Sequence, residues 1–214
     1  MVMECIPSHD ASYWTDQFKV VGGNAALDFI NTISERHSDA PVERIRSYSD
    51  LVAASQQIGV LTEAQARLLL EASREAPEAA EVIRRQAVAL RELLYGMFSA
   101  VANGREPSPS DLDRFNEMLS EALTHLRVEC ISEGTFAWAW DERSGALDRM
   151  LWPFLRAAAT LLVSARLGRV QACAADDCGW LFLDMSRNRS RRWCDMADCG
   201  NRAKARRFKE RHAD

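Results

Sequence analysis

The six cysteines are the residues of this 214-residue sequence whose spacing points most directly to chemistry. Four lie in the last fifth of the chain as two matched pairs, Cys173-x4-Cys178 and Cys194-x4-Cys199, with 15 residues between the pairs. Tetrahedral zinc commonly takes four thiolates from two short turns that give two ligands each. The spacing therefore predicts one zinc ion per chain, with a structural role, because four thiolates leave no open position for an activated water.

Free buried thiols and two disulfides are the alternatives for these four cysteines. The N-terminus lacks a basic stretch followed by an apolar one, so we expect no signal peptide and a cytoplasmic protein, in which disulfides are rare. No run of 18 apolar residues occurs, so no membrane span is expected. Residues 173–214 are mostly polar and too few to fold by burial alone, which also favours a metal. Cys5 and Cys130 stand alone and are not expected to bind it.

Charge divides the chain at the same place. The net charge of -4 and 47% hydrophobic residues are typical of a globular protein, and exclude wholesale disorder and a fibrous repeat. Residues 1–172 carry a net charge of -7 and residues 173–214 one of +3. All 10 basic residues of the tail lie between Ser186 and His212, where the net charge is +7. The basic surface is therefore local, on an acidic body.

Eight of these ten basic residues are arginines, whose guanidinium groups can make paired hydrogen bonds to phosphate or guanine. The candidate nucleic-acid contacts are Arg187, Arg189, Arg191, Arg192, Arg202, Lys204, Arg206 and Arg207. The alternative is a solvated helix face that pairs with the acidic body. Nearby aromatic residues could stack on bases, but Trp180 and Phe182 are expected to form a small core under the zinc, while Trp193 remains open to either role.

The first 168 residues show mostly helical periodicity. A short strand is expected at 18–21, followed by a helix that opens near Asn24. Further helices are expected at 49–58, capped by Ser49 and Asp50, and at 62–73, 77–102, 110–126 and 146–167. Alternating apolar residues from Leu126 to Trp140 around a Glu133-Gly134 turn predict a β-hairpin, with Cys130 in the core.

The tail is expected to contain a strand at 180–183, a basic loop at 187–192 and a helix at 201–212. On that helix Ala205, Phe208 and His212 share one face, which we expect to dock on the rest of the protein. The predicted fold class is mostly α. A multihelical domain with a small β-hairpin (1–168) precedes a zinc-ribbon-like four-cysteine module (169–214) that ends in a basic helix.

Polar residues also gather near the first expected helix. Asn24, Asp28 and Asn31 fall on one helical face beside apolar neighbours, and Arg36 could pair with Asp28. They could line a small-molecule pocket, but a buried polar network that fixes helix packing is favoured. No nucleophile motif, phosphate-binding glycine loop or histidine cluster is found, so no catalytic residues and no enzymatic activity are expected.

Four motifs resemble known families. Residues 199–202 spell C-G-N-R, the signature of the CGNR zinc-finger family, and residues 178–182 (CGWLF) and 191–194 (RRWC) are also similar to that family's pattern. Residues 23–32 (GNAALDFINT) resemble the L-D-F-x-N-T opening of the ABATE domain of stress-induced transcription regulators. The resemblance implies a zinc-dependent protein that binds nucleic acid and regulates transcription.

Together, the residues and the resemblance favour DNA over RNA as the partner. RNA binding is one alternative, and the other is a helical domain that binds a small-molecule effector or a protein, with the finger mediating protein contacts. A homodimer is compatible with DNA binding, since many DNA-binding proteins pair half-sites.

Overall fold

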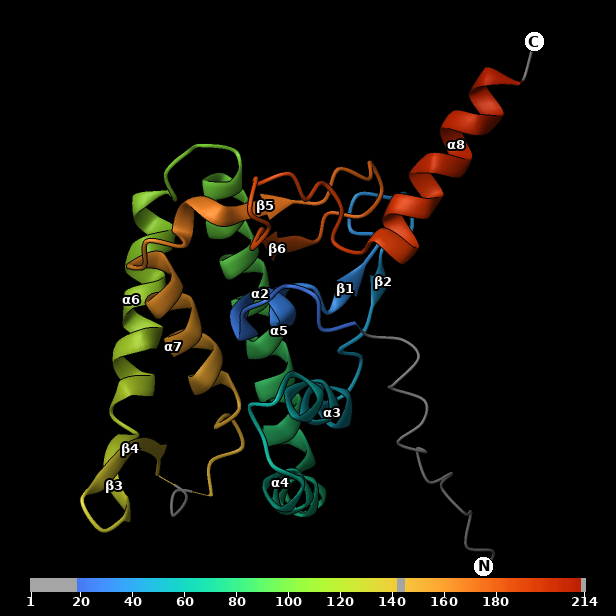
Figure 1. Cartoon of the computed structure of the whole chain (residues 1–214). Helices are drawn as coiled ribbons and strands as arrows, with labels where there is room; N and C mark the ends of the chain where they lie inside the picture. Colours follow the sequence, from blue (N-terminus) through green and yellow to red (C-terminus); the bar gives the residue numbers. More distant parts are fainter. Residues whose placement is uncertain (1–18, 142–144, 213–214) are drawn as a thin grey trace, which may run out of the picture.

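The computed structural model describes residues 19–141 and 145–212 (Figure 1). The fold is mostly α-helical with small antiparallel strand pairs, as the sequence predicts. The α-helices are α2 (Ala25–Ile30), α3 (Tyr48–Ile58), α4 (Glu63–Glu75), α5 (Pro77–Ala102), α6 (Pro109–Leu123), α7 (Leu151–Leu162) and α8 (Asn201–Arg211). The strands pair as β1 (Ile33–Ser34) with β2 (Val42–Glu43), β3 (Leu126–Ser132) with β4 (Thr135–Trp140), and β5 (Val170–Ala172) with β6 (Leu181–Leu183). Cys5 and Phe18 lie outside the described residues.

Helix α5 is the longest element and lies at the centre of the core. Its buried side chains include Leu90, Leu94 and Phe98, and the helices α2, α3, α4 and α6 contact it. Helix α2 also packs on α7, where the rings of Phe29 and Phe154 stack with centroids 4.4 Å apart. Helix α2 also contacts β6, so the residues just after α2 are well placed to meet the C-terminal strands (Figure 1).

Local capping signals locate several helix ends correctly. Thr62 and Gln65 form the predicted capping box of α4, Pro77 is in the first turn of α5, and Gly59 ends α3 with a φ of 86°. The predicted cap of α3 is wrong. Ser47 is its N-cap, and Asp50 is the reciprocal member of that capping box, since its side chain accepts from the Ser47 N–H at 3.0 Å.

The long helix predicted at 146–167 is also wrong, because α7 covers only Leu151–Leu162. Pro153 lies in its first turn, where the missing N–H costs nothing, and a helix that began at 146 would place this proline in its interior. At the other end, the hydroxyl of Ser164 donates to the Leu161 carbonyl at 2.9 Å, which competes with continued helical pairing.

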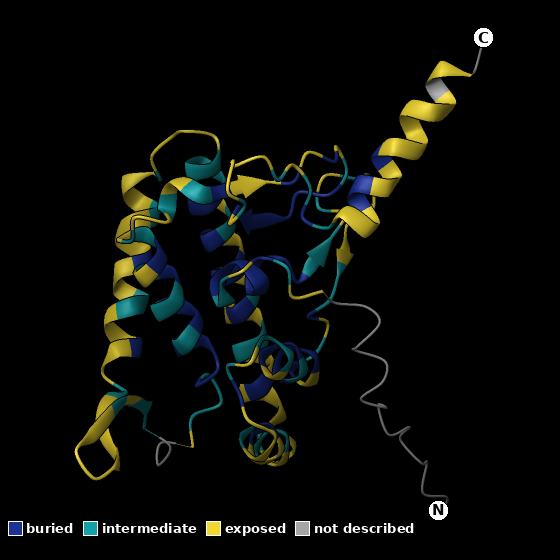
Figure 2. Ribbon diagram, in the orientation of Figure 1, coloured by how far each residue is buried: buried dark blue, intermediate teal, exposed yellow. Residues whose placement is uncertain are grey.

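The predicted hairpin forms, but its environment differs from the prediction. Strands β3 and β4 pair antiparallel with Cys130 opposite Phe136, and the ladder shifts between Cys130 and Ser132. Cys130 is exposed, so the prediction that it belongs to the core is wrong. Only the base of the hairpin packs on the core, through Trp140, and the rest lies beyond the ends of α6 and α7 (Figures 1 and 2).

The C-terminal strands pack directly on the helical core. Val170, Leu181 and Leu183 are buried in the same apolar cluster as α2, α5 and α7.

The predicted strand at 18–21 is wrong for its described residues, 19–21, which are irregular. The Val21 carbonyl accepts from the Arg191 guanidinium at 3.0 Å instead of from a neighbouring strand. Among the described residues, no helix is long and apolar enough to cross a membrane.

Candidate metal centre and basic surface

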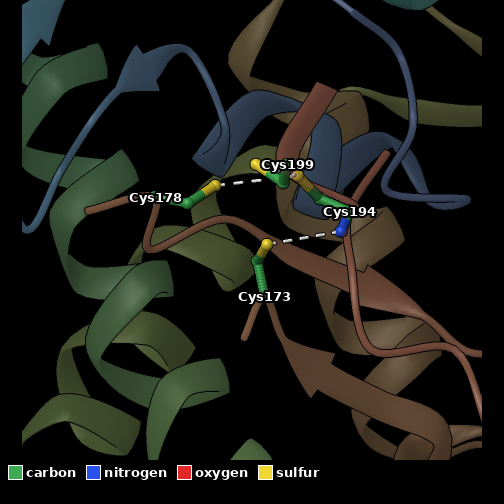
Figure 3. Close-up of side chains that lie close together, drawn as sticks. All are labelled: Cys173, Cys178, Cys194 and Cys199. Carbon is green, nitrogen blue, oxygen red and sulfur yellow. Dashed lines mark hydrogen bonds between the residues drawn. The ribbon is translucent and has the colours of Figure 1, made fainter. Parts of the chain in front are cut away.

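Two turns bring the four predicted ligands together (Figure 3). Cys173 directly follows β5 and Cys178 lies just before β6, so the first turn connects paired strands. Cys194 follows the basic loop, and Cys199 lies in a π-helical turn, Met196–Gly200, that leads into α8. Each cysteine pair therefore occupies one turn, as the matched spacing predicts.

The sulfur atoms have the geometry that one metal ion requires. All four lie within 4.8 Å of one another, all four cysteines are buried, and none forms a disulfide. The Sγ of Cys194 lies 3.6 Å from that of Cys178 and 3.6 Å from that of Cys199. A tetrahedral zinc site with Zn–S bonds of about 2.3 Å places its sulfurs about 3.8 Å apart. The cysteines are thus positioned to bind one zinc ion, and the alternative of two disulfides does not describe the structure.

The electrostatics of the four thiols favour a cation. Hydrogen bonding to Cys178 and Cys194 lowers the pKa of Cys173, whereas hydrogen bonding to Cys173 raises the pKa of both Cys178 and Cys194. One thiolate therefore suppresses ionisation of its neighbours, because like charges this close repel. A divalent cation removes that repulsion and allows all four sulfurs to bind as thiolates.

A small aromatic core supports the site, as the sequence predicts for Trp180 and Phe182. Both are buried against the four cysteines, and Trp193 packs on the same cluster while partly exposed. The indole N–H of Trp180 donates to the Ile33 carbonyl at 2.7 Å, which ties the first cysteine turn to β1. The backbone N–H of Arg36 donates to the Cys178 carbonyl at 3.1 Å, close to this contact.

The residues after Cys199 each have a physical role. A Cβ on Gly200 would lie 2.4 Å from the Met196 sulfur and 3.2 Å from the Trp193 ring, so the turn has little room for a side chain. The Asn201 side chain donates to the Ala197 carbonyl at 3.1 Å, which stabilises the π-helical turn that carries Cys199. The Asn201 side chain does not cap α8, whose N-cap residue is Gly200.

Arg202 connects the metal centre to its surroundings. Its guanidinium donates to Cys199 Sγ at 3.3 Å and to Asp177 at 3.1 Å, and lies 3.3 Å from an Asp198 oxygen and 3.9 Å from one of Glu35. The hydrogen bond to Cys199 raises the pKa of Arg202. This side chain is thus held between the cysteine turns and the loop after β1.

Arg191 is committed to the fold of the finger. Its guanidinium donates to the carbonyls of Val21, Leu183, Trp193 and Cys194, and its carbon lies 4.2 Å from the centroid of the Phe182 ring. The Asp184 carboxylate, buried nearby, accepts from the N–H groups of Ser186 and Arg191 and so shapes the basic loop. Sequence reasoning missed Asp184, because its role depends on contacts that form only in the folded loop.

Helix α8 projects from the body, and Figure 2 colours most of its described residues as exposed. Ala203 is its one buried residue among those whose side chains are described. The prediction that Ala205, Phe208 and His212 form a docking face is wrong, since all three are exposed. Phe208 stacks instead on His212, with ring centroids 4.1 Å apart.

The other basic candidates differ in their contacts. Arg206 lies 2.9 Å from the exposed carboxylate of Asp176, and the Arg192 guanidinium is 5.5 Å from the Trp193 ring centroid. The remaining candidates, Arg187, Arg189, Lys204 and Arg207, are exposed. The structure therefore divides the predicted set into side chains that hold the finger together, Arg191 and Arg202, and side chains directed to solvent.

The polar residues around α2 form a network that includes the finger. Asn24 caps α2, and the Gly22 N–H donates to Asp28 at 2.7 Å. Asn31 is fully buried and exchanges two hydrogen bonds with the Leu181 backbone, of 2.8 and 2.9 Å. Burial raises the pKa of Asp28 to about 6. Arg36 contacts Glu92 and lies 3.9 Å above the Tyr95 ring, so its predicted pairing with Asp28 is wrong.

The comparisons with known proteins agree with this description. A search of curated proteins gives no match. Residues 169–212 match the CGNR zinc finger, which includes all four cysteines. Residues 23–165 match ABATE, whose description is "Putative stress-induced transcription regulator". The chain therefore belongs to the ABATE family and carries a CGNR zinc finger at its C-terminal end.

Proposed function

We propose that this chain is a DNA-binding transcription regulator whose zinc finger presents α8 and the basic loop at 187–192 to duplex DNA. The observation that carries the proposal is the exposure of α8, which projects from the packed helical body (Figures 1 and 2). Packing against the body stabilises an exposed polar helix only slightly. Packing therefore does not explain why α8 projects from the body. Binding to an extended anionic partner supplies a reason.

The dimensions and charge of α8 suit a DNA major groove. An α-helix with side chains is about 10–12 Å across, and the major groove of B-DNA is about 12 Å wide. On a helical wheel Lys204, Arg207 and Arg211 flank one side of α8, and Arg206 and Lys209 flank the other, so both phosphate backbones would meet a cation. The major groove of A-form RNA is deep and narrow, which favours DNA as the partner.

The acidic body would limit contact to the finger. Residues 1–172 carry a net charge of -7, which opposes close approach of a polyanion to the helical domain. Zinc would act in this proposal by fixing the turn at Cys199, and therefore the direction in which α8 leaves the body. The contacts of Arg202 would hold that direction from outside the metal site.

The proposal is of a binding protein without a catalytic role. The described histidines take part in packing: His37 contacts the Tyr95 hydroxyl at 2.7 Å, His125 stacks on Trp152, and His212 contacts the Phe208 carbonyl. Four thiolates around one zinc would also leave no position for a reacting water. These observations support binding as the function.

Equilibrium binding of the zinc-loaded full chain to duplex DNA and to RNA, measured across a range of salt concentrations, tests the proposal. We expect tighter binding to DNA, and we expect the double substitution Lys204→Gln and Arg207→Gln to reduce the slope of log affinity against log salt by about two. The matched control replaces Arg67 and Arg105, two exposed arginines of the helical domain, with Gln and should leave the slope unchanged.

Three outcomes would overturn the proposal. Tighter binding to RNA than to DNA would make RNA the partner. Equal loss of affinity in both double variants would show that the response follows net charge and not the surface of α8. Absence of binding to either nucleic acid would favour a finger that contacts proteins.

A further inference from the structure

The β3–β4 hairpin carries the most concentrated group of exposed apolar side chains in the described part of the chain. Val128, Ile131, Phe136 and Trp138 are 60%, 65%, 67% and 59% exposed. Scattered apolar residues are normal on a protein surface, but a contiguous group of this size marks a site of interaction. A two-stranded hairpin is also only marginally stable in water without something packed against it.

Strand pairing places most of these side chains on one face. Val128 lies opposite Trp138, and Cys130 lies opposite Phe136, so these four residues share one side of the ribbon. We call them the hairpin face. Ile131 adjoins it at the irregularity in the ladder. None of the four side chains is charged, and Arg156 of α7 contacts the face, with its guanidinium carbon 5.2 Å from the Trp138 ring centroid.

We propose that the hairpin face is the interface of a homodimer, in which the same face of a second copy packs against it. A two-fold interface requires a surface that is complementary to itself. The hairpin face meets this requirement. None of its four side chains is charged, so the faces of two copies can meet without repulsion between like charges. A partner with a charged or strongly polar surface would have to lose its hydration and would gain few hydrogen bonds in return. Among these four side chains only the Trp138 indole N–H and the Cys130 thiol are donors, and the thiol already donates to the Ser132 carbonyl.

The available area agrees with a weak, reversible dimer. If a full aromatic side chain offers about 150–250 Å², the exposed parts of the hairpin face and Ile131 amount to roughly 500 Å² per chain. Two copies would then bury roughly 1,000 Å² in total, which is the lower end of the range for specific interfaces. The dimer should therefore form in a concentration-dependent way.

The position of the hairpin determines what such a dimer can do. Figure 1 shows the hairpin and α8 at opposite ends of the molecule. A dimer formed through the hairpin face would leave both copies of α8 uncovered and directed away from the interface. It would therefore present two separated basic helices, a geometry suited to holding two distant segments of a polyanion and not two adjacent half-sites.

Sedimentation velocity of the zinc-loaded full chain, without nucleic acid, over a range of concentrations tests the proposal. We expect a monomer–dimer equilibrium that Val128→Glu and Phe136→Glu each weaken by at least about tenfold, which corresponds to about 1.4 kcal/mol. Both positions are exposed in the monomer, so folding should survive, as circular dichroism and zinc content would verify. The matched control is Val163→Glu at the end of α7, a position that is 87% exposed and outside the hairpin face.

Alkylation of Cys130, in a chain with Cys5→Ser, gives a second measurement, because the Cys130 thiol lies on the hairpin face. Its rate should fall as the dimer fraction rises. A monomer at every concentration would overturn the proposal, as would a dimer that both glutamate variants leave intact or one that Val163→Glu disrupts equally. Slow alkylation of Cys130 in a monomer would show that another part of the chain covers the face, which also contradicts a homodimer.

Discussion

At the scale of single residues, Arg202 explains why an arginine follows the last cysteine turn. Its planar guanidinium reaches a cysteine sulfur and carboxylates from two separate segments, Asp177 before Cys178 and Asp198 before Cys199. A lysine ammonium would provide the charge without the planar fork that serves several acceptors together. Arg202 therefore supports the metal centre from outside its ligands.

Replacing Arg202 with Gln should weaken zinc binding by about 10- to 100-fold, which is the usual effect of losing a partner of a metal ligand. Competition for zinc with a chromophoric chelator would measure the change. Arg202→Lys should recover only part of the affinity. Arg207→Gln removes the same charge from an exposed position of α8 and should leave zinc affinity unchanged, and an equal loss in both variants would contradict this role of Arg202.

Asp28 should make stability depend on pH. Its pKa of about 6 in the folded chain is higher than that of an unfolded aspartate, because burial disfavours the charged form. The folded state therefore binds more protons, and stability falls as pH rises through 6. Between pH 5 and 7.5 the wild-type chain should lose about 1 kcal/mol relative to Asp28→Asn. Urea unfolding of both proteins would measure this difference, and parallel pH profiles would contradict the assignment.

At the scale of elements, Asn31 joins α2 to β6. Its amide satisfies both the N–H and the carbonyl of Leu181 in a buried site. Asn31→Ala would leave both backbone groups without these partners and should lower the free energy of unfolding by about 2–4 kcal/mol. Chemical denaturation would measure the loss. Asn116→Ala, at an exposed position of α6, is the control and should change stability by less than about 0.5 kcal/mol.

Elements whose signals are local could be predicted from the sequence. The capping box at Thr62, the proline of α5 and the hairpin turn at Glu133-Gly134 depend on residues a few positions apart, and all are observed. The metal site belongs to the same class, because matched cysteine pairs in two short turns constrain their own geometry. The boundaries of α7 differ from the prediction. The apolar pattern of residues 146–167 suggests one long helix, whereas Pro153 indicates where α7 begins and Ser164 where it ends.

Burial could not be predicted where it depends on which elements meet. Alternation correctly indicated that Cys130 shares a face with apolar residues, but not that this face would lie beyond the helical core. The prediction that Ala205, Phe208 and His212 dock on the protein failed for a similar reason. Helical periodicity shows which residues share a face, but not whether another element covers that face. Arg191 resembles its basic neighbours in sequence, and only the folded loop surrounds it with four carbonyls.

At the scale of the whole molecule, the finger contributes to the core of the helical domain. Val170, Leu181 and Leu183 pack among the helices, while most of α8 packs on nothing in the described structure. Loss of the finger therefore exposes apolar surface of the body, whereas loss of α8 beyond its first turn does not.

A chain that ends at Gly168 should lose most of its stability. Burial of each of the three removed side chains is worth about 1.5–3 kcal/mol, a large fraction of the 5–15 kcal/mol typical of a folded domain. Thermal unfolding followed by circular dichroism should show no cooperative transition near that of the full chain. A chain that ends at Ala205 keeps Arg202 and Ala203 and should unfold like the full chain. Cooperative unfolding of both truncated chains at the full-chain temperature would contradict this prediction.

In the proposed function, zinc organises the finger so that α8 can bind DNA. Fluorescence anisotropy of a labelled duplex, titrated with zinc-loaded chain, with chain stripped of zinc by a chelator and with chain to which zinc has been returned, tests it most directly. We predict binding by the zinc-loaded chain, its loss on zinc removal and its recovery when zinc is restored. Equal affinity with and without zinc, or no binding by the zinc-loaded chain, would contradict the claim.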